Sequence, residues 1–239
     1  MVAEIPFQIV ENIGIRVFAP PRLKEIKGVA KPYKFTIPGL RKYIGEVYSD
    51  ESILILWPPH ARIPYPALIL IDLTLTNNLK TLVISYRYSE EELKRVLKTS
   101  LKELIEDEEL LDKVLEKHMM FEAFNPYGMS LEELRMVEIE LAEKYNPDMV
   151  VLHGTEMLLP VLKTDPRRYY DLLVNQAYQY KSMGKVLVKV ASYMNEEQFR
   201  LYSALSDIII RVFMRKAQEG FEPYLYLWRK GEDASNIKT

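Results

Sequence analysis

The chain has 239 residues, of which 48% are hydrophobic and 28% are charged, and its formal net charge is −2. This length and balance suit one large or two small globular domains and exclude an intrinsically disordered chain. The near-neutral charge argues against a free-standing nucleic-acid binder, which usually carries a basic excess. The chain contains no cysteine, which excludes disulfides, a thiolate nucleophile and a cysteine-ligated metal site. A thermophilic source is compatible with this composition.

The sequence shows no signal for secretion or for a membrane. Its first residues lack the basic start and the long apolar run of a signal peptide. The most apolar stretch, Ile53–Leu75, is interrupted by prolines, by His60 and by Arg62. It therefore does not supply the roughly 20 consecutive apolar residues that span a bilayer. We expect a cytoplasmic protein that makes no membrane contact.

The chain divides into three parts. Residues 1–32 are rich in Pro and Lys and are expected to form an extended lead-in segment. A core domain is expected over residues 33–231, followed by a polar tail over residues 232–239. Short apolar runs in the core predict strands buried on both faces. These runs are Ile53–Trp57, Thr81–Tyr86, Met119–Phe124, Met149–Gly154 and Val186–Ala191.

Helical patterns separate these strands. A buried helix is expected over Pro66–Leu79, and a charged helical region follows from Ser89 to about His118. Ser130 and Glu133 form a capping box that predicts the start of another helix. Strands that alternate with helices imply a mainly parallel sheet with helices on both faces.

The chain closes with two strands, expected at Asp207–Met214 and Pro223–Lys230, which form an antiparallel pair around a short turn. The expected fold is therefore an α/β domain of three layers, with a mainly parallel central sheet and an antiparallel C-terminal edge hairpin. Many functions share this architecture, so the architecture does not itself indicate one.

An ordered series of local patterns over about residues 33–231 resembles the RecA superfamily of ATPases, and most of all its KaiC-type branch. The segments that carry the resemblance are KFTIPGLRKYIG (34–45), TLVISYRYSEEELKRVL (81–97), FNPYGMSLEEL (124–134), KYNPDMVVLHG (144–154), KSMGKVLVKVAS (181–192), LSDIIIRVFM (205–214) and YLYLWRKG (224–231). The order of the series, rather than any single motif, makes the likeness specific. It implies a RecA-like three-layer fold.

The resemblance also implies a phosphate-binding loop of the form G-x-x-x-x-G-K-[ST], whose Lys neutralises phosphate charge and whose Ser/Thr holds magnesium. The matching stretch is WPPHARIP. Trp57 replaces the first Gly, Arg62 the second, Ile63 the Lys and Pro64 the Ser/Thr, and His60 lies between them. An alternative is that the loop lies elsewhere, but the nine glycines of the chain include no Gly-Lys-Ser/Thr.

Two further positions of the family differ. The family's fourth strand ends in an Asp that supports magnesium, and this chain has His153 there. An acidic residue that orients the attacking water follows the family's second strand, and this chain has Arg87 and Tyr88 there. The Lys, the metal carboxylate and the catalytic Glu are thus missing together, and the loss of charge stabilisation is severe for phosphoryl transfer. We expect neither a nucleotide cofactor nor a metal.

Three residues, His60, Arg62 and His153, are expected near the former phosphate site. They either form a repurposed anion site or general base, or belong to a vestigial loop that its own side chains fill. The three histidines of the chain have no recognisable zinc-ligand spacing.

A basic and aromatic stretch, KTDPRRYYD, provides Lys163, Arg167 and Arg168. In RecA-like recombinases the loop after the fourth strand faces DNA, so these side chains are candidates for phosphate contacts. The alternative is a solvated helix start with its tyrosines on the core side. Glu196 and Glu197 in the next candidate DNA loop argue against a DNA path.

The frame of an ATPase without its ATP-handling residues predicts a non-catalytic RecA/KaiC-like protein, a pseudo-ATPase. Its expected role is structural or regulatory, as a partner of a protein or peptide, including an ATPase-competent paralogue or another copy of this chain. The alternative is a nucleic-acid-binding accessory protein of the recombinase-paralogue type. A third hypothesis is an enzyme of changed chemistry around His60 and His153.

Overall fold

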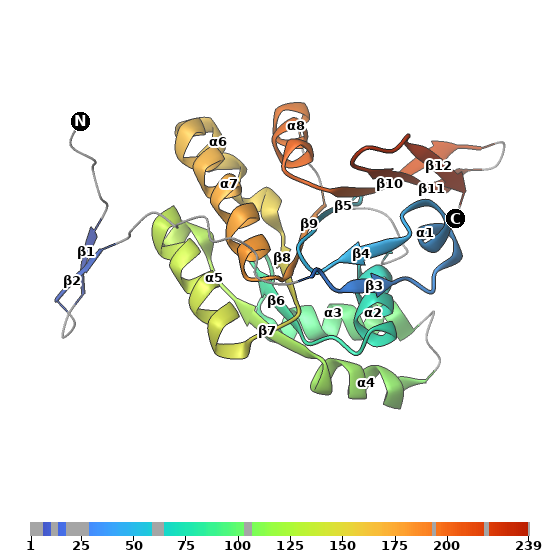
Figure 1. The fold of residues 1–239 in the computed structure, drawn as a ribbon, viewed down its shortest axis with the longest axis horizontal. Helices are drawn as coiled ribbons and strands as arrows, with labels where there is room; N and C mark the ends of the chain where they lie inside the picture. The colour runs from blue at the N-terminus through green and yellow to red at the C-terminus, as the bar shows by residue number, and fades with distance from the viewer. Residues whose placement is uncertain are drawn as a thin grey trace.

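The computed structural model of this chain describes residues 7–10, 14–17, 29–58, 65–102, 107–192, 195–217 and 220–238. Its centre is a sheet formed by β5 (Ser52–Leu56), β6 (Thr81–Ser85), β7 (Met119–Ala123), β8 (Met149–His153), β9 (Val186–Ala191), β10 (Ile208–Lys216), β11 (Phe221–Arg229) and β12 (Ser235–Lys238). The strand order is β12-β11-β10-β5-β9-β8-β6-β7 (Figure 1).

The sheet is mainly parallel. Strands β7, β6, β8, β9, β5 and β10 pair in parallel, whereas β10–β11 and β11–β12 are antiparallel. Every residue of β6 and β9 is buried, as expected of strands covered on both faces. The predictions of a mainly parallel α/β sheet and of an antiparallel C-terminal hairpin are confirmed.

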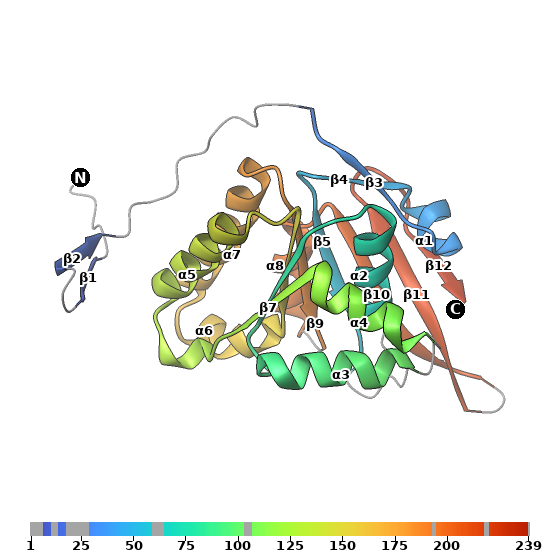
Figure 2. The same cartoon turned by 90° about the horizontal axis from the view of Figure 1, so that it is seen from below.

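Helices cover both faces of the sheet (Figures 1 and 2). One face carries α2 (Tyr65–Thr76), α3 (Glu90–Lys102) and α4 (Glu108–Lys117), and the other carries α5 (Leu131–Tyr145), α6 (Leu159–Thr164), α7 (Pro166–Ser182) and α8 (Glu196–Ala204). Alternate strand residues supply two apolar clusters. Ile53 and Val83 belong to the first, and Leu54 and Leu82 to the second, because successive side chains of a strand point to opposite faces.

Smaller elements complete the domain. Helix α1 (Pro38–Tyr43) and the pair β3 (Pro32–Lys34) and β4 (Glu46–Tyr48) add Leu40, Tyr33 and Val47 to the first apolar cluster. Two single turns of 3-10 helix, η1 (Pro126–Gly128) and η2 (Thr155–Leu158), follow β7 and β8. Because η2 follows β8 directly, Glu156 of η2 lies close to Ser192, which follows the neighbouring strand β9.

Local capping signals set the helix starts. The Ser130 side chain accepts from the Glu133 N–H while the Glu133 carboxylate accepts from the Ser130 N–H, which confirms the capping box at α5. Asn195 caps α8 by accepting from the Gln198 N–H. The charged region from Ser89 to about His118 forms two helices, α3 and α4, rather than one.

The boundaries of the domain differ from those expected. The segment 232–239, expected to be a polar tail, contributes β12, which pairs with Tyr224–Leu227 of β11. Backbone hydrogen bonds pair this segment with the edge of the sheet, and Ile237 packs against the first apolar cluster. In the expected lead-in segment, β1 (Phe7–Val10) and β2 (Gly14–Val17) pair antiparallel, and most of its other residues lie outside the described part.

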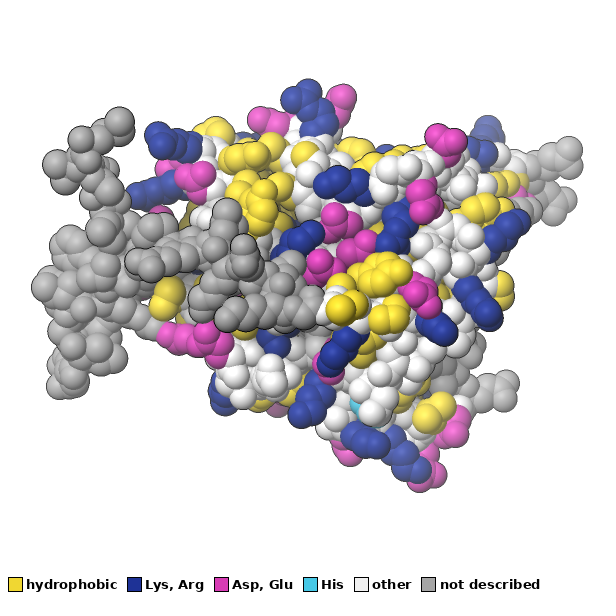
Figure 3. Space-filling model, in the orientation of Figure 1, with side chains coloured by type: hydrophobic (Ala, Val, Ile, Leu, Met, Phe, Trp, Pro, Cys, Tyr) yellow, Lys and Arg dark blue, Asp and Glu magenta, His cyan; other side chains and the backbone are white. Residues whose placement is uncertain are grey.

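The surface carries charges of both signs. On the face shown in Figure 3, lysine and arginine side chains lie beside aspartate and glutamate side chains, and apolar groups lie between them. This interspersed pattern is that of an ordinary solvated surface. Among the described residues, every helix is too short or too polar to cross a membrane.

Candidate functional site

The carboxyl ends of β5, β9, β8 and β6 meet at one edge, because these strands are parallel neighbours in the sheet. In open α/β sheets, ligands bind in the crevice beyond these ends. Trp57 follows β5, and its N–H donates to the Ala191 carbonyl of β9 at 3.2 Å. The N–H of Tyr86, after β6, donates to the carbonyl of His153 at 2.9 Å. These bonds continue the sheet to the start of each loop.

An arginine ties three of the loops together. Arg87 Nη1 donates to Glu156 Oε1 and to Ser192 Oγ, both at 2.9 Å, and Ser192 Oγ donates to Glu156 Oε1 at 2.8 Å. Arg87 follows β6 and Ser192 follows β9, with β8 between them in the sheet. The guanidinium therefore bridges the end of β8. We call Arg87, Glu156 and Ser192 the arginine clamp.

Close backbone packing supports the arginine clamp. Gly154 has a φ of +77°, a conformation that strongly favours glycine. A Cβ atom at this position would lie 2.8 Å from the Cβ of Arg87. Both the backbone conformation and the close approach of Arg87 therefore require glycine where the chain turns from β8 into η2.

His153 lies near Arg87 and Glu156 of the arginine clamp, in contact with Ser85 and Tyr88. Its Nδ1 is 3.2 Å from Ser85 Oγ, and its ring stacks on that of Tyr88 with centroids 5.6 Å apart. The Arg87 guanidinium lies 5.2 Å from the centroid of the same tyrosine ring. Burial lowers the pKa of His153 to about 4, against the attraction of Glu156, and Arg87 lowers it further. The imidazole is therefore neutral at neutral pH.

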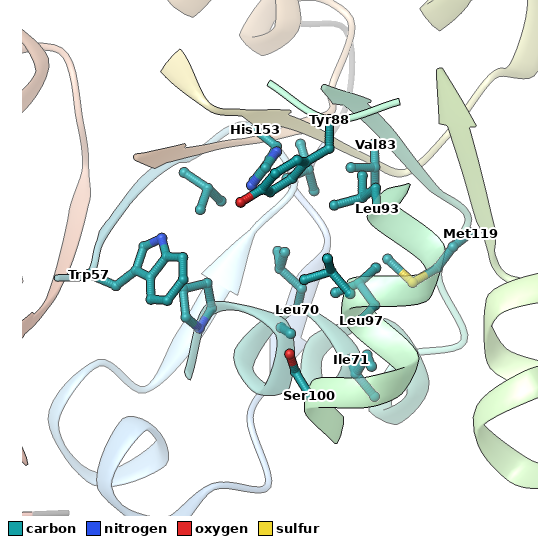
Figure 4. A pocket seen from close by; sticks show the side chains of 15 residues that line it. Trp57, Leu70, Ile71, Val83, Tyr88, Leu93, Leu97, Ser100, Met119 and His153 are labelled. Atoms are coloured by element: carbon teal, nitrogen blue, oxygen red, sulfur yellow. The ribbon is translucent and has the colours of Figure 1, made fainter. Parts of the chain in front are cut away.

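A cavity of about 150 Å³ opens between α2 and α3 on the first face of the sheet. Figure 4 shows Trp57 on one side of it, His153 and Tyr88 together on another, and Ser100 at the far end. The remaining described residues that line it are apolar: Pro66, Ala67, Leu70, Ile71, Val83, Leu93, Val96, Leu97, Met119, Val151 and Val190. The carboxyl edge thus combines a polar clamp with an apolar chamber.

The structure brings together Trp57, Arg87, Tyr88 and His153, which the sequence singled out as positions where ATP-handling residues are missing. The other loop positions, His60, Arg62, Ile63 and Pro64, lie outside the described residues, so the expected grouping of His60, Arg62 and His153 stays a prediction. Sequence reasoning missed Glu156, Ser192 and Ser85. Their only available signal was their place at or just after a predicted strand.

Three basic residues expected as nucleic-acid contacts are all exposed. Lys163 lies in the last turn of α6, and Arg167 and Arg168 lie in the first turn of α7. Arg168 Nε is 3.6 Å from Asp165 and 3.8 Å from Glu132, so acidic groups already neutralise part of its charge. Lys163 and Arg167 are thus the stronger candidates for phosphate contacts.

The adjoining tyrosines divide between core and surface. The buried Tyr169 donates from its hydroxyl to that of Tyr202 at 3.0 Å, whereas Tyr170 is 46% exposed. The start of α7 is therefore a solvated helix end that presents one aromatic side chain beside its arginines.

A buried polar network that the sequence did not indicate lies on the second face of the sheet. Glu138 of α5 is 1% exposed, and its carboxylate accepts from the Tyr86 hydroxyl and from Gln176 Nε2, at 3.0 and 2.9 Å for the two Gln176 bonds. Burial raises the pKa of Glu138 to about 7. Burial also lowers the pKa of Lys189 to about 8, although the charge of Glu138 opposes that change.

Comparison with protein-family models gives no match for this chain, and comparison with curated proteins gives none either. Within the part of the chain that the structure describes, no three His, Asp or Glu side chains come together as a metal-ligand group.

Proposed function

We propose that this chain is a non-catalytic protein of RecA/KaiC-like architecture, a pseudo-ATPase that serves as a structural or regulatory partner of a protein or peptide. The partner is an ATPase-competent relative or a second copy of this chain. Support comes from the parallel sheet with its antiparallel C-terminal edge, and from the chemistry at the carboxyl ends of its strands.

The arginine clamp is the observation that carries the proposal. Arg87 stands where the resemblance places a catalytic acid, and its guanidinium is bound to Glu156 and Ser192. His153 stands where the resemblance places the magnesium-supporting Asp, and it is neutral and stacked on Tyr88. An acid that orients water and an acid that supports magnesium are thus replaced by an internal ion pair and an aromatic stack, which do neither task.

The adjoining cavity also suits a protein that does not handle nucleotides. None of the described residues that line it is Lys, Arg, Asp or Glu. A triphosphate with magnesium needs cationic groups and carboxylates within contact distance, because several full charges must be neutralised. The described residues of this apolar chamber provide no such compensation.

Calorimetry with ATP and with ADP, each with and without Mg²⁺, tests this proposal on the purified chain. We expect no saturable heat with either nucleotide. Micromolar binding would overturn the proposal, and hydrolysis would then have to be measured directly. An active ATPase titrated under the same conditions controls for the quality of the nucleotide and the metal.

A second candidate function, a nucleic-acid-binding accessory protein, is favoured by one observation. Lys163 and Arg167 are exposed on either side of the corner between α6 and α7, and the exposed Tyr170 lies three residues after Arg167 on α7. Cations next to an aromatic face are what single-stranded nucleic acid requires, since phosphates pair with the cations and bases stack on the ring.

Fluorescence anisotropy with a labelled oligo-dT at several salt concentrations tests this second function. If it is correct, Lys163→Ala with Arg167→Ala weakens binding and reduces the slope of log affinity against log salt by about 1.4, or about 0.7 per lost phosphate contact. The matched control, Arg95→Ala with Lys117→Ala, removes two exposed charges from the opposite face of the sheet. The absence of binding even at low salt would remove this function, and equal losses in the two double variants would place the contact elsewhere.

A further inference from the structure

The cavity at the carboxyl edge has the size of a single ring. Its volume is about 150 Å³ and it is partly open to solvent, and an enclosed apolar protein cavity of that order accepts a molecule such as benzene. Drug-sized ligands need about 300 Å³ or more. The space between α2 and α3 therefore selects a molecule with one ring and few substituents.

Most of the wall is apolar and is set by buried groups. Leu70, Val83 and Met119 come from α2, β6 and β7, and each is less than a tenth exposed. Because the described lining residues include no Lys, Arg, Asp or Glu, a charged ligand would lose its hydration without gaining a partner. The described part of the wall therefore favours a neutral occupant.

Hydrogen bonds to Ser85 fix which nitrogen of His153 carries the proton. Ser85 Oγ accepts from the N–H of Arg87 at 3.3 Å and from the N–H of Tyr88 at 3.0 Å. Both lone pairs of this oxygen are then used, so its own proton goes to His153 Nδ1, 3.2 Å away. The neutral imidazole consequently carries its proton on Nε2, which makes Nε2 a hydrogen-bond donor beside the cavity.

Aromatic side chains line the same end of the cavity. Trp57 faces the His153–Tyr88 stack across the space (Figure 4). Leu70 and Leu97 separate these aromatic rings from Ser100. Aromatic rings prefer offset-stacked or edge-to-face partners at centroid distances of about 4.5 to 7 Å. A flat ring is thus favoured over an aliphatic group of equal volume.

We propose that this cavity binds a small neutral aromatic molecule with one hydrogen-bond acceptor, its ring between α2 and α3 and its acceptor on His153 Nε2. This site does not depend on the proposed function, because a chain that binds nucleotides elsewhere would keep the cavity, and a chain that does not bind nucleotides could lack the ligand. Calorimetry with nucleotides therefore tests the proposed function, and the binding of small aromatic probes tests the cavity.

The chain contains two tryptophans, so Trp228→Phe leaves Trp57 as the only indole and makes its emission a reporter of the cavity. The probes are p-cresol and p-xylene, which share a shape but differ in the oxygen that accepts from His153. We expect both to change the Trp57 emission saturably. His153→Phe, which keeps a ring against Tyr88, should weaken p-cresol about fivefold to tenfold and leave p-xylene unchanged.

Variants that fill the cavity provide an independent test of ligand binding. Ala67→Leu and Ser100→Leu add carbon atoms to its wall and floor and should abolish the binding of both probes, whereas Thr99→Leu, at the exposed neighbouring position on α3, should leave both affinities unchanged. Circular dichroism and the thermal midpoint show whether each variant is folded, and Ser100→Leu remains informative if Ala67→Leu does not fold. An unchanged Trp57 emission with both probes, or binding that persists in a folded filled variant, overturns the proposal. An unchanged affinity for p-cresol in folded His153→Phe overturns the role of His153.

Discussion

Replacing Glu138 by leucine is expected to lower the free energy of unfolding at pH 7 by about 3 to 5 kcal/mol. The carboxylate accepts from the Tyr86 hydroxyl and from the Gln176 amide inside the second apolar cluster. Removing it leaves two buried donors without an acceptor, each at a cost of about 1 to 3 kcal/mol. It also removes the negative charge that opposes the lowering of the Lys189 pKa.

Urea unfolding of Glu138→Leu beside Glu143→Leu measures this effect. Glu143 is exposed on the same helix, so its replacement is expected to stay within about 0.5 kcal/mol of the parent chain. Glu138→Gln keeps one oxygen acceptor and should fall between the two. If Glu138→Leu costs no more than the control, the network contributes nothing to stability and its buried carboxyl would need another explanation.

Two buried groups are expected to give the stability opposite dependences on pH. The pKa of Glu138 is raised from 4.5 to about 7, so the folded state holds this proton more tightly. The stability that the folded state gains from binding this proton more tightly is full below pH 4.5 and is lost as the pH rises through 7. The pKa of His153 is lowered from 6.5 to about 4, so the folded state disfavours the proton. The stability linked to the unprotonated imidazole is full above pH 6.5 and is lost as the pH falls through 4.

The opposing slopes overlap between about pH 4.5 and 6.5, and single variants separate them. Glu138→Gln should leave a stability that rises with pH across this window, whereas His153→Phe should leave one that falls with pH. A shift of the size given for Glu138 corresponds to a change on the order of 3 kcal/mol over its full range. Unfolding free energies measured at half-unit steps from pH 4 to 7 give both slopes, and parallel curves for the two variants would contradict the assignment.

Much of the layer architecture was readable from local patterns. The uninterrupted apolar runs of β6 and β9 predict strands covered on both faces, because only such strands can bury every side chain. The capping box at Ser130 and Glu133 is a contact between residues three positions apart, so the local chain specifies it. The turn between β10 and β11 likewise joins strands that are close in sequence.

The contacts of the site could not be read in this way. The arginine clamp joins residues 87, 156 and 192, and the buried network joins residues 86, 138 and 176. Their meeting depends on the order of the strands, which places β8 between β6 and β9. Strand order follows from how whole faces pack, and no periodicity within one segment encodes it. The strand β12 was missed for a related reason, since its backbone hydrogen bonds to β11 and the packing of its Ile237 on the first apolar cluster both depend on the tertiary structure.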